Sequence, residues 1–137
     1  MGLYLCVFDN DNELDGVEVG SYADFNFFRD AVVRVVEGGQ LGSKCPTLVS
    51  HADSDGEWTS DEVAQLLHEL DVIKEAFGKM PPVEFNSSWK MGVAKTMGIV
   101  PKSLLDCFFD VDGEPLLDRL RGLAEQSVRK NVPILFQ

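Results

Sequence analysis

Hydrophobic positions recur at spacings of three and four along three long stretches of this chain, a pattern that predicts amphipathic helices. In the middle stretch, Thr59 stands three residues before Glu62, which is the spacing of a helix-opening capping box. Gly78 is expected just after the end of this helix. The positions predicted to form its buried face are Val63, Leu66, Leu67, Leu70, Ile73 and Phe77.

The other helical stretches lie near the two ends of the chain. Ser21 and Asp24 form a second capping box, and Gly38-Gly39 is expected to end the helix that follows. The first helix is predicted to bury Tyr22, Phe25, Phe28, Val32 and Val35. The last helix is expected to be capped by Asp112 or Gly113 and to bury Leu116, Leu117, Leu120, Leu123 and Val128. A shorter helix is predicted over Lys90 to Met97.

Strands are predicted where short apolar or β-branched runs lie between turn residues. They are expected at residues 3–8, 17–19, 47–50, 83–85 and 133–137, with Asp15-Gly16 as a hairpin turn and the last strand paired with the first. The first of these strands is expected to be buried on both faces. Residues 1–137 are therefore expected to form a single α+β domain. We expect a small mixed or antiparallel sheet of about four to five short strands, packed with three to five helices in a single layer on one face.

Charge adds a functional constraint, because the 137-residue chain has a formal net charge of −11. Residues 1–62 hold 13 acidic and 3 basic side chains, while residues 63–137 hold 10 and 9. Such a chain is not expected to bind nucleic acid or an anionic membrane directly, since both repel it. The concentration of acid in one half suggests a face that meets a basic partner.

The cellular location of the protein and the redox state of its cysteines are inferred from sequence patterns that the chain lacks. No apolar run reaches the ~20 residues needed to span a membrane, and the start of the chain does not resemble a signal peptide, so a cytoplasmic protein is expected. Cys6, Cys45 and Cys107 are far apart in sequence, and we interpret them as buried, reduced thiols. No cofactor and no zinc site are expected.

Residues 51–62 also allow a second interpretation, as an altered calcium loop. Asp53, Asp55, Gly56 and Glu62 occupy positions of the EF-hand pattern, but His51 stands where that pattern needs an acidic oxygen ligand. The preceding residues also favour a strand over the required helix. A capped turn explains the stretch without an ion.

An enzyme remains the rival class of function. In this alternative, Asp9, Asp11, Asp53 and Asp55 converge at strand ends and bind a divalent cation for hydrolysis. Acidic residues at turns and at helix starts are, however, expected from capping alone. No residue is therefore assigned a catalytic role.

Several stretches together resemble a family of bacterial immunity proteins from polymorphic-toxin systems, the one numbered seventy. The resemblance lies in the segments Gly2–Phe8, Leu14–Ser21, His51–Trp58, Asp110–Leu117 and Pro133–Gln137. It implies a bacterial, cytoplasmic protein that binds a cognate toxin and blocks it, without catalysis. Many such toxins are nucleases with basic clefts, so a basic toxin is the expected partner.

The expected partner-binding face combines two acidic loops with an aromatic residue that follows the second loop. Trp58 is either an anchor of the interface or a packing residue beside the helix start. The residues predicted for this face are Asp9, Asp11, Glu13, Asp15, Asp53, Asp55, Glu57 and Trp58.

Overall fold

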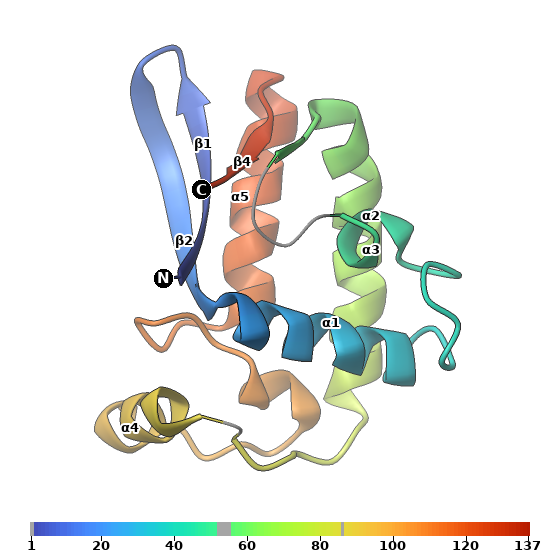
Figure 1. Ribbon diagram of the computed structural model, residues 1–137, viewed down its shortest axis with the longest axis vertical. Helices are drawn as coiled ribbons and strands as arrows, with labels where there is room; N and C mark the ends of the chain where they lie inside the picture. The colour runs from blue at the N-terminus through green and yellow to red at the C-terminus, as the bar shows by residue number, and fades with distance from the viewer. Residues whose placement is uncertain (1, 52–55, 86) are drawn as a thin grey trace.

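A four-stranded antiparallel sheet and a set of helices make up the protein (Figure 1). The computed structural model describes residues 2–51, 56–85 and 87–137. In chain order the elements are β1 (Gly2–Asp9), β2 (Asn12–Ser21), α1 (Tyr22–Val35), α2 (Pro46–Val49), β3 (Glu57–Trp58), α3 (Ser60–Gly78), α4 (Ser88–Met97), the 3-10 helix η1 (Leu104–Cys107), α5 (Leu116–Lys130) and β4 (Ile134–Phe136). This architecture confirms the predicted α+β class.

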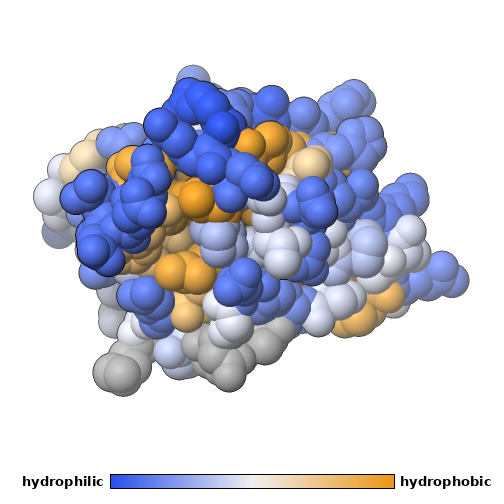
Figure 2. Space-filling model, turned by 90° about the horizontal axis from the view of Figure 1, so that it is seen from above, coloured by the Kyte–Doolittle hydropathy of each residue, from blue (hydrophilic) through white to orange (hydrophobic). Residues whose placement is uncertain are grey.

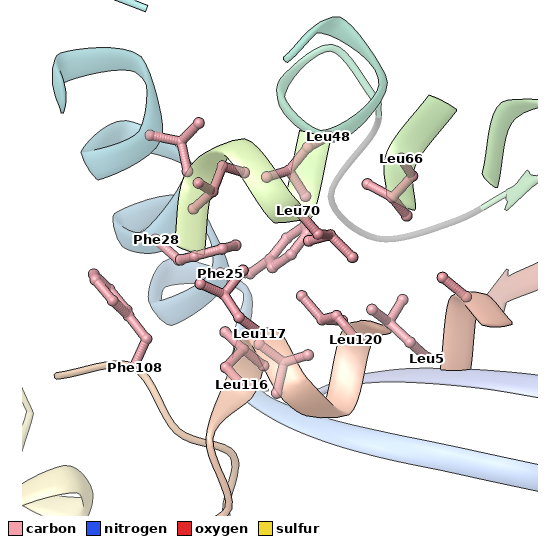
Figure 3. Packing of buried hydrophobic residues seen from close by; sticks show 14 of the residues in the cluster. Leu5, Phe25, Phe28, Leu48, Leu66, Leu70, Phe108, Leu116, Leu117 and Leu120 are labelled. Atoms are coloured by element: carbon pink, nitrogen blue, oxygen red, sulfur yellow. The ribbon is translucent and has the colours of Figure 1, made fainter. Parts of the chain in front are cut away.

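Helices α3 and α5 lie on one side of the β1–β2 hairpin, and α4 lies below it, as Figure 1 shows. Helix α5 packs against both the sheet and α3, and α1 runs from the lower end of β2 toward α3. Figure 3 shows Phe25 and Phe28 of α1 in the core with Leu70 of α3 and Leu120 of α5. Burying such side chains contributes about 1.5–3 kcal/mol each.

Both predicted capping boxes are present, and they fix where α1 and α3 begin. Ser21 and Asp24 exchange side-chain-to-backbone hydrogen bonds at the start of α1, and Thr59 and Glu62 do so at the start of α3. Each pair satisfies N–H groups that the first helical turn leaves without partners. Helix α3 also includes Gly78, so our expectation that this residue lies beyond the helix is wrong.

The sheet has the strand order β2-β1-β4-β3. As predicted, the last strand pairs with the first, through Leu5 with Phe136 and Cys6 with Leu135. On the other side of β4, Trp58 pairs with Ile134. The short strand β3 thus joins the segment before α3 to the end of the chain.

The hairpin turns earlier than the sequence predicts. The turn lies at Asn10, whose φ of 58° is left-handed, and at Asp11. Asp15 and Gly16 lie inside β2 and pair with Val7 and Cys6. Because Asn tolerates the left-handed region, a tight turn at Asn10 extends the strand pairing through most of the predicted loop.

Residues 47–50, predicted as a strand, instead belong largely to the short helix α2. Pro46 stands at its first position, where its fixed φ suits a helix. The buried carboxylate of Glu69 accepts hydrogen bonds from the backbone N–H groups of Thr47 and Leu48, at 3.3 and 3.0 Å. A tertiary contact from α3 therefore overrides the local preference of β-branched residues.

Three further details of the second half differ from expectation. Residues 83–85 form no strand, and the N–H of Val83 bonds the Cys107 Sγ at 3.4 Å. The residue before α5 is Pro115, with no side-chain cap, so the predicted cap at Asp112 or Gly113 is wrong. The Asp110 carboxylate instead accepts from the N–H groups of Asp112 and Glu114. Val128, predicted to be buried, is 41% exposed.

Candidate partner-binding face

The sheet has one face turned toward the helices and one turned away from them. On the inner face of β1, Leu3, Leu5 and Val7 are at most 1% exposed. The alternate residues Tyr4, Cys6 and Phe8 point the other way, since successive side chains of a strand alternate. We call this outward side the open face and define it by the outward residues Tyr4, Cys6, Phe8, Glu13, Gly16, Glu18, Leu135 and Glu57.

The strand register places one row of these residues across the whole sheet. Gly16, Cys6, Leu135 and Glu57 are successive partners on β2, β1, β4 and β3. At a strand spacing of 4.7–4.9 Å, this row is roughly 14 Å long. Glu57 is exposed and lies at one end of the row, so the open face has an acid at its β3 edge.

A phenol–carboxylate pair occupies the β2 side of the open face. The Tyr4 hydroxyl donates a hydrogen bond of 2.5 Å to Oε1 of Glu13. This bond, together with burial and the Glu13 charge, raises the pKa of Tyr4 to about 12. The Tyr4 side chain crosses Gly16 so closely that a Cβ there would be 1.9 Å from the Tyr4 hydroxyl. Gly16 therefore makes room for the Tyr4–Glu13 pair.

Cys6 lies on the open face but is fully buried, between Tyr4 and Phe8 along the same strand. Burial, and then the charge of Glu13, raise the pKa of its thiol. Because the thiolate is the nucleophilic form, this environment disfavours a reactive cysteine. Cys6 contributes packing beneath the surface of the face.

The acidic residues of the first hairpin separate into two groups. Asp9 and Asp11 lie at the turn, and Glu13 joins the open face. Asp15 points the opposite way, because its carboxylate pairs with Arg119 of α5 at 3.3 Å. Among the described residues, Asp9, Asp11 and Glu13 make no ion pair, whereas Asp15 is paired with Arg119.

Arg119 fixes the hairpin to the rest of the domain. Besides Asp15, its guanidinium donates to the Gly16 carbonyl at 2.6 Å and lies 3.4 Å from the buried Asp110 carboxylate. One side chain therefore joins β2, α5 and the turn before α5. This contact sets the orientation in which the open face is presented.

Of the second predicted loop, the structure describes Gly56, Glu57 and Trp58. Asp53 and Asp55 lie outside the described residues. Trp58 is 1% exposed, and its indole N–H donates to the Thr47 carbonyl at 2.9 Å, which matches the packing interpretation. His51 Nε2 lies 2.9 Å from the Glu57 carbonyl oxygen, and its ring stacks on Phe136 with centroids 4.1 Å apart.

Sequence reasoning does not select Tyr4, Phe8, Glu18 and Leu135 as part of this face. The alternation along residues 3–8 is the available signal, but the apolar character of the whole run favours a strand buried on both faces. Glu18 is exposed, while Tyr4, Phe8 and Leu135 are half-buried. Figure 2, viewed from the hairpin end, shows hydrophobic surface between hydrophilic side chains.

Two negative findings apply to the described ranges alone. Within residues 2–51, 56–85 and 87–137, no group of three or more His, Cys, Asp or Glu side chains is arranged to hold a metal ion. In the same ranges, no helix is both long and apolar enough to cross a bilayer.

Comparison with known protein families gives a match over nearly the whole chain. The model of a family described as Immunity protein 70 matches residues 3–136. No curated protein and no solved structure shows significant similarity to the chain.

Proposed function

Because the chain belongs to the Immunity protein 70 family, we propose that it protects the cell that makes it by binding a toxin protein and blocking that toxin. The observation that carries this proposal is the extent of the match, which covers nearly the whole domain. The proposed role is binding, so it requires no catalytic residue.

The toxin is proposed to dock on the open face together with the adjoining hairpin turn. This surface joins half-buried apolar groups, Tyr4, Phe8 and Leu135, to exposed carboxylates at its margins. Apolar or aromatic centres with polar rims are characteristic of protein interfaces. The acidic margin favours a partner with a basic surface, which it would attract and orient during encounter.

A nuclease of the cytoplasm is the toxin type that fits this surface best. A nuclease cleft must attract phosphates, so it is basic, and an acidic inhibitor can occupy it with carboxylates. Glu13 suits such a role because the Tyr4 hydroxyl holds it in place. A carboxylate that is already oriented loses less conformational freedom on binding.

The alternative of a calcium site or metal-dependent hydrolase has less support. Of its four proposed ligands, Asp9 and Asp11 lie at the hairpin turn, and the other two, Asp53 and Asp55, lie outside the described residues. No observation on the described part of the chain favours this reaction.

Co-expression tests the proposed role. A cell that expresses the toxin candidate from the neighbouring gene should survive when the wild-type chain is also expressed, and die without it. The Thr59→Ala variant serves as a folded control that should protect as well as wild type. Continued killing in the presence of soluble, folded wild-type chain would refute the proposal for that toxin.

A further inference from the structure

The exposed apolar surface of this protein gathers around α4. Among the described residues, five of the eight exposed large hydrophobic side chains lie between positions 80 and 100. Met91, Met97 and Val100 are the most open of the five, at 53%, 56% and 78% exposed. We call this region the α4 surface and define it by Met80, Val83, Met91, Gly92, Met97 and Val100. Such clusters on a folded domain commonly mark an interaction site.

Hollows lie on both flanks of α4. One has a volume of about 600 Å³ and lies between Met91, Val83 and Pro101. The other has a volume of about 390 Å³ and lies between Met97, Val93 and Val111. The surface is therefore shaped like a ridge with two grooves, which a matching ridge and grooves could fill.

The inner side of α4 is fixed to the body of the protein. The Trp89 indole N–H donates to the Asp24 carboxylate at 2.8 Å. The Lys90 ammonium is buried over the ring of Phe108, at 5.1 Å from its centroid, and lies 5.7 Å from that of Phe27. The ridge is therefore already in place before any partner arrives.

Charges of both signs surround the α4 surface. Lys95 lies on α4, Lys102 and Asp106 line a hollow with Val100, and Glu84 and Asp112 line the two flanking hollows. Among the described residues, these five charged side chains make no ion pair. In a two-fold contact, the positive groups of such a mixed surface can meet the negative groups of a second copy.

We propose that the α4 surface binds a second copy of this chain in a two-fold symmetric dimer. A two-fold axis lets the lysines of one copy approach the acids of the other, around a centre of methionine and valine. Residues 1–62 carry −10 of the net charge of −11, so contact through this balanced region brings two acidic molecules together with the least repulsion.

The same arrangement leaves the hairpin-turn end of the open face free on both copies, while the other end, at Glu18, adjoins the α4 flank through Val111, whose N–H donates to the Glu18 carbonyl at 3.1 Å. The hairpin turn and α4 lie at opposite ends of the molecule (Figure 1). The dimer thus goes beyond the proposed function and does not depend on it. A basic or acidic partner is a poorer fit for this surface, because its mixed charges attract neither sign strongly.

Two substitutions test the dimer without disturbing the core. Met91→Lys places a charge at the centre of the contact. Gly92→Gln adds a side chain where a Cβ meets no heavy atom within 4 Å, so the monomer accepts it and α4 gains helix propensity. The matched controls are Leu41→Lys, at another exposed apolar residue, and Gly122→Gln, at a helical glycine of α5 with equal space.

Light scattering coupled to size-exclusion chromatography gives the readout. Wild type and both controls should reach twice the chain mass of 15.2 kDa as concentration rises. Met91→Lys and Gly92→Gln should raise the dimer dissociation constant at least about tenfold, with unchanged helical circular dichroism.

Either of two results overturns the proposal. Wild type could stay monomeric at its highest soluble concentration, or the dimer could survive both α4 substitutions. Binding of the wild-type protein to anionic phospholipid vesicles and to the toxin candidate is measured as well. A monomeric wild type that binds either one through Met91 would assign the surface to that occupant instead.

Discussion

Replacing Glu37 with glutamine should destabilise the protein far more than one carboxylate-to-amide change usually does. Glu37 follows α1 and is 4% exposed. Its Oε2 accepts hydrogen bonds from the N–H groups of Lys44 and Cys45, at 2.9 and 2.8 Å, and its Oε1 accepts from Gly42 at 3.0 Å. One carboxylate thus holds the loop that joins α1 to α2.

The size of the stability loss depends on which of the three hydrogen bonds the glutamine amide can still accept. The single oxygen of the introduced amide can serve Lys44 and Cys45, but its NH₂ group then faces the N–H of Gly42. The half-buried Gly42 N–H is then left without an acceptor, for which a fully buried donor would cost about 1–3 kcal/mol, and loss of the charge weakens the other two bonds. We expect a total near 2.5 kcal/mol, which for 137 residues lowers Tm by about 8 °C.

The loss should also depend on pH. Burial by itself raises the pKa of the Glu37 carboxyl, but the three N–H groups together hold it below its ordinary value of 4.5. A lowered folded pKa adds stability that is complete above the ordinary value and is lost as pH falls through the folded value. The difference between wild type and Glu37→Gln should therefore shrink below pH 4.5.

Urea unfolding followed by circular dichroism between pH 3 and pH 7 measures both effects. Glu75→Gln is the control, because the Glu75–Lys79 pair is largely exposed and should change stability by less than ~0.5 kcal/mol. If Glu37→Gln behaved like this control at pH 7, or if its effect stayed constant on acidification, the assigned role of Glu37 would be wrong.

Three further predictions concern the capped helix, the open face and the calcium alternative. Thr59→Ala should lower the free energy of unfolding by about 1 kcal/mol through loss of the α3 cap, with toxin affinity retained; a large loss of affinity would contradict this assignment. Gly16→Ala should displace the Tyr4 ring and weaken toxin binding, with Gly122→Ala as its control, and an unchanged affinity would show that the Tyr4–Glu13 pair is not used. Excess calcium should leave the thermal midpoint unchanged relative to chelator, whereas an occupied site at a hundredfold over its dissociation constant would add about 2.7 kcal/mol.

Local rules predicted the helices well because their signals lie within a few residues. The boxes at Ser21 and Thr59 use side chains three positions apart, and both occur as expected. The strand predicted at residues 47–50 was wrong because the helix there depends on a distant residue. The Glu69 carboxylate accepts a hydrogen bond from the N–H of Leu48, 21 residues away in the chain. The predicted position of the hairpin turn was wrong because Asp15-Gly16 and Asn10 both suit a turn. The pairing of β2 along the length of β1 decides between them.

The sequence identified some of the acidic residues of the candidate face but not the directions in which their side chains point. Counting acids located Glu13 and Glu57, which the register of four strands places on one face. It could not show that Asp15 turns inward, because Arg119 lies 104 residues away in the chain. Glu18 was missed because β2 is longer than predicted, and a strand of three residues gave no register against Tyr4.

The affinity of the purified toxin candidate for paired charge variants tests the central claim most directly. Glu18→Lys with Glu57→Lys reverses the two margins of the open face. Asp30→Lys with Glu75→Lys makes the same change in net charge at exposed sites on α1 and α3. Titration calorimetry at physiological salt should show that the first pair weakens binding about thirtyfold or more, near 2 kcal/mol, and that the second has little effect. Equal weakening by the two pairs would mean that bulk charge attracts the toxin, and it would contradict binding through the open face.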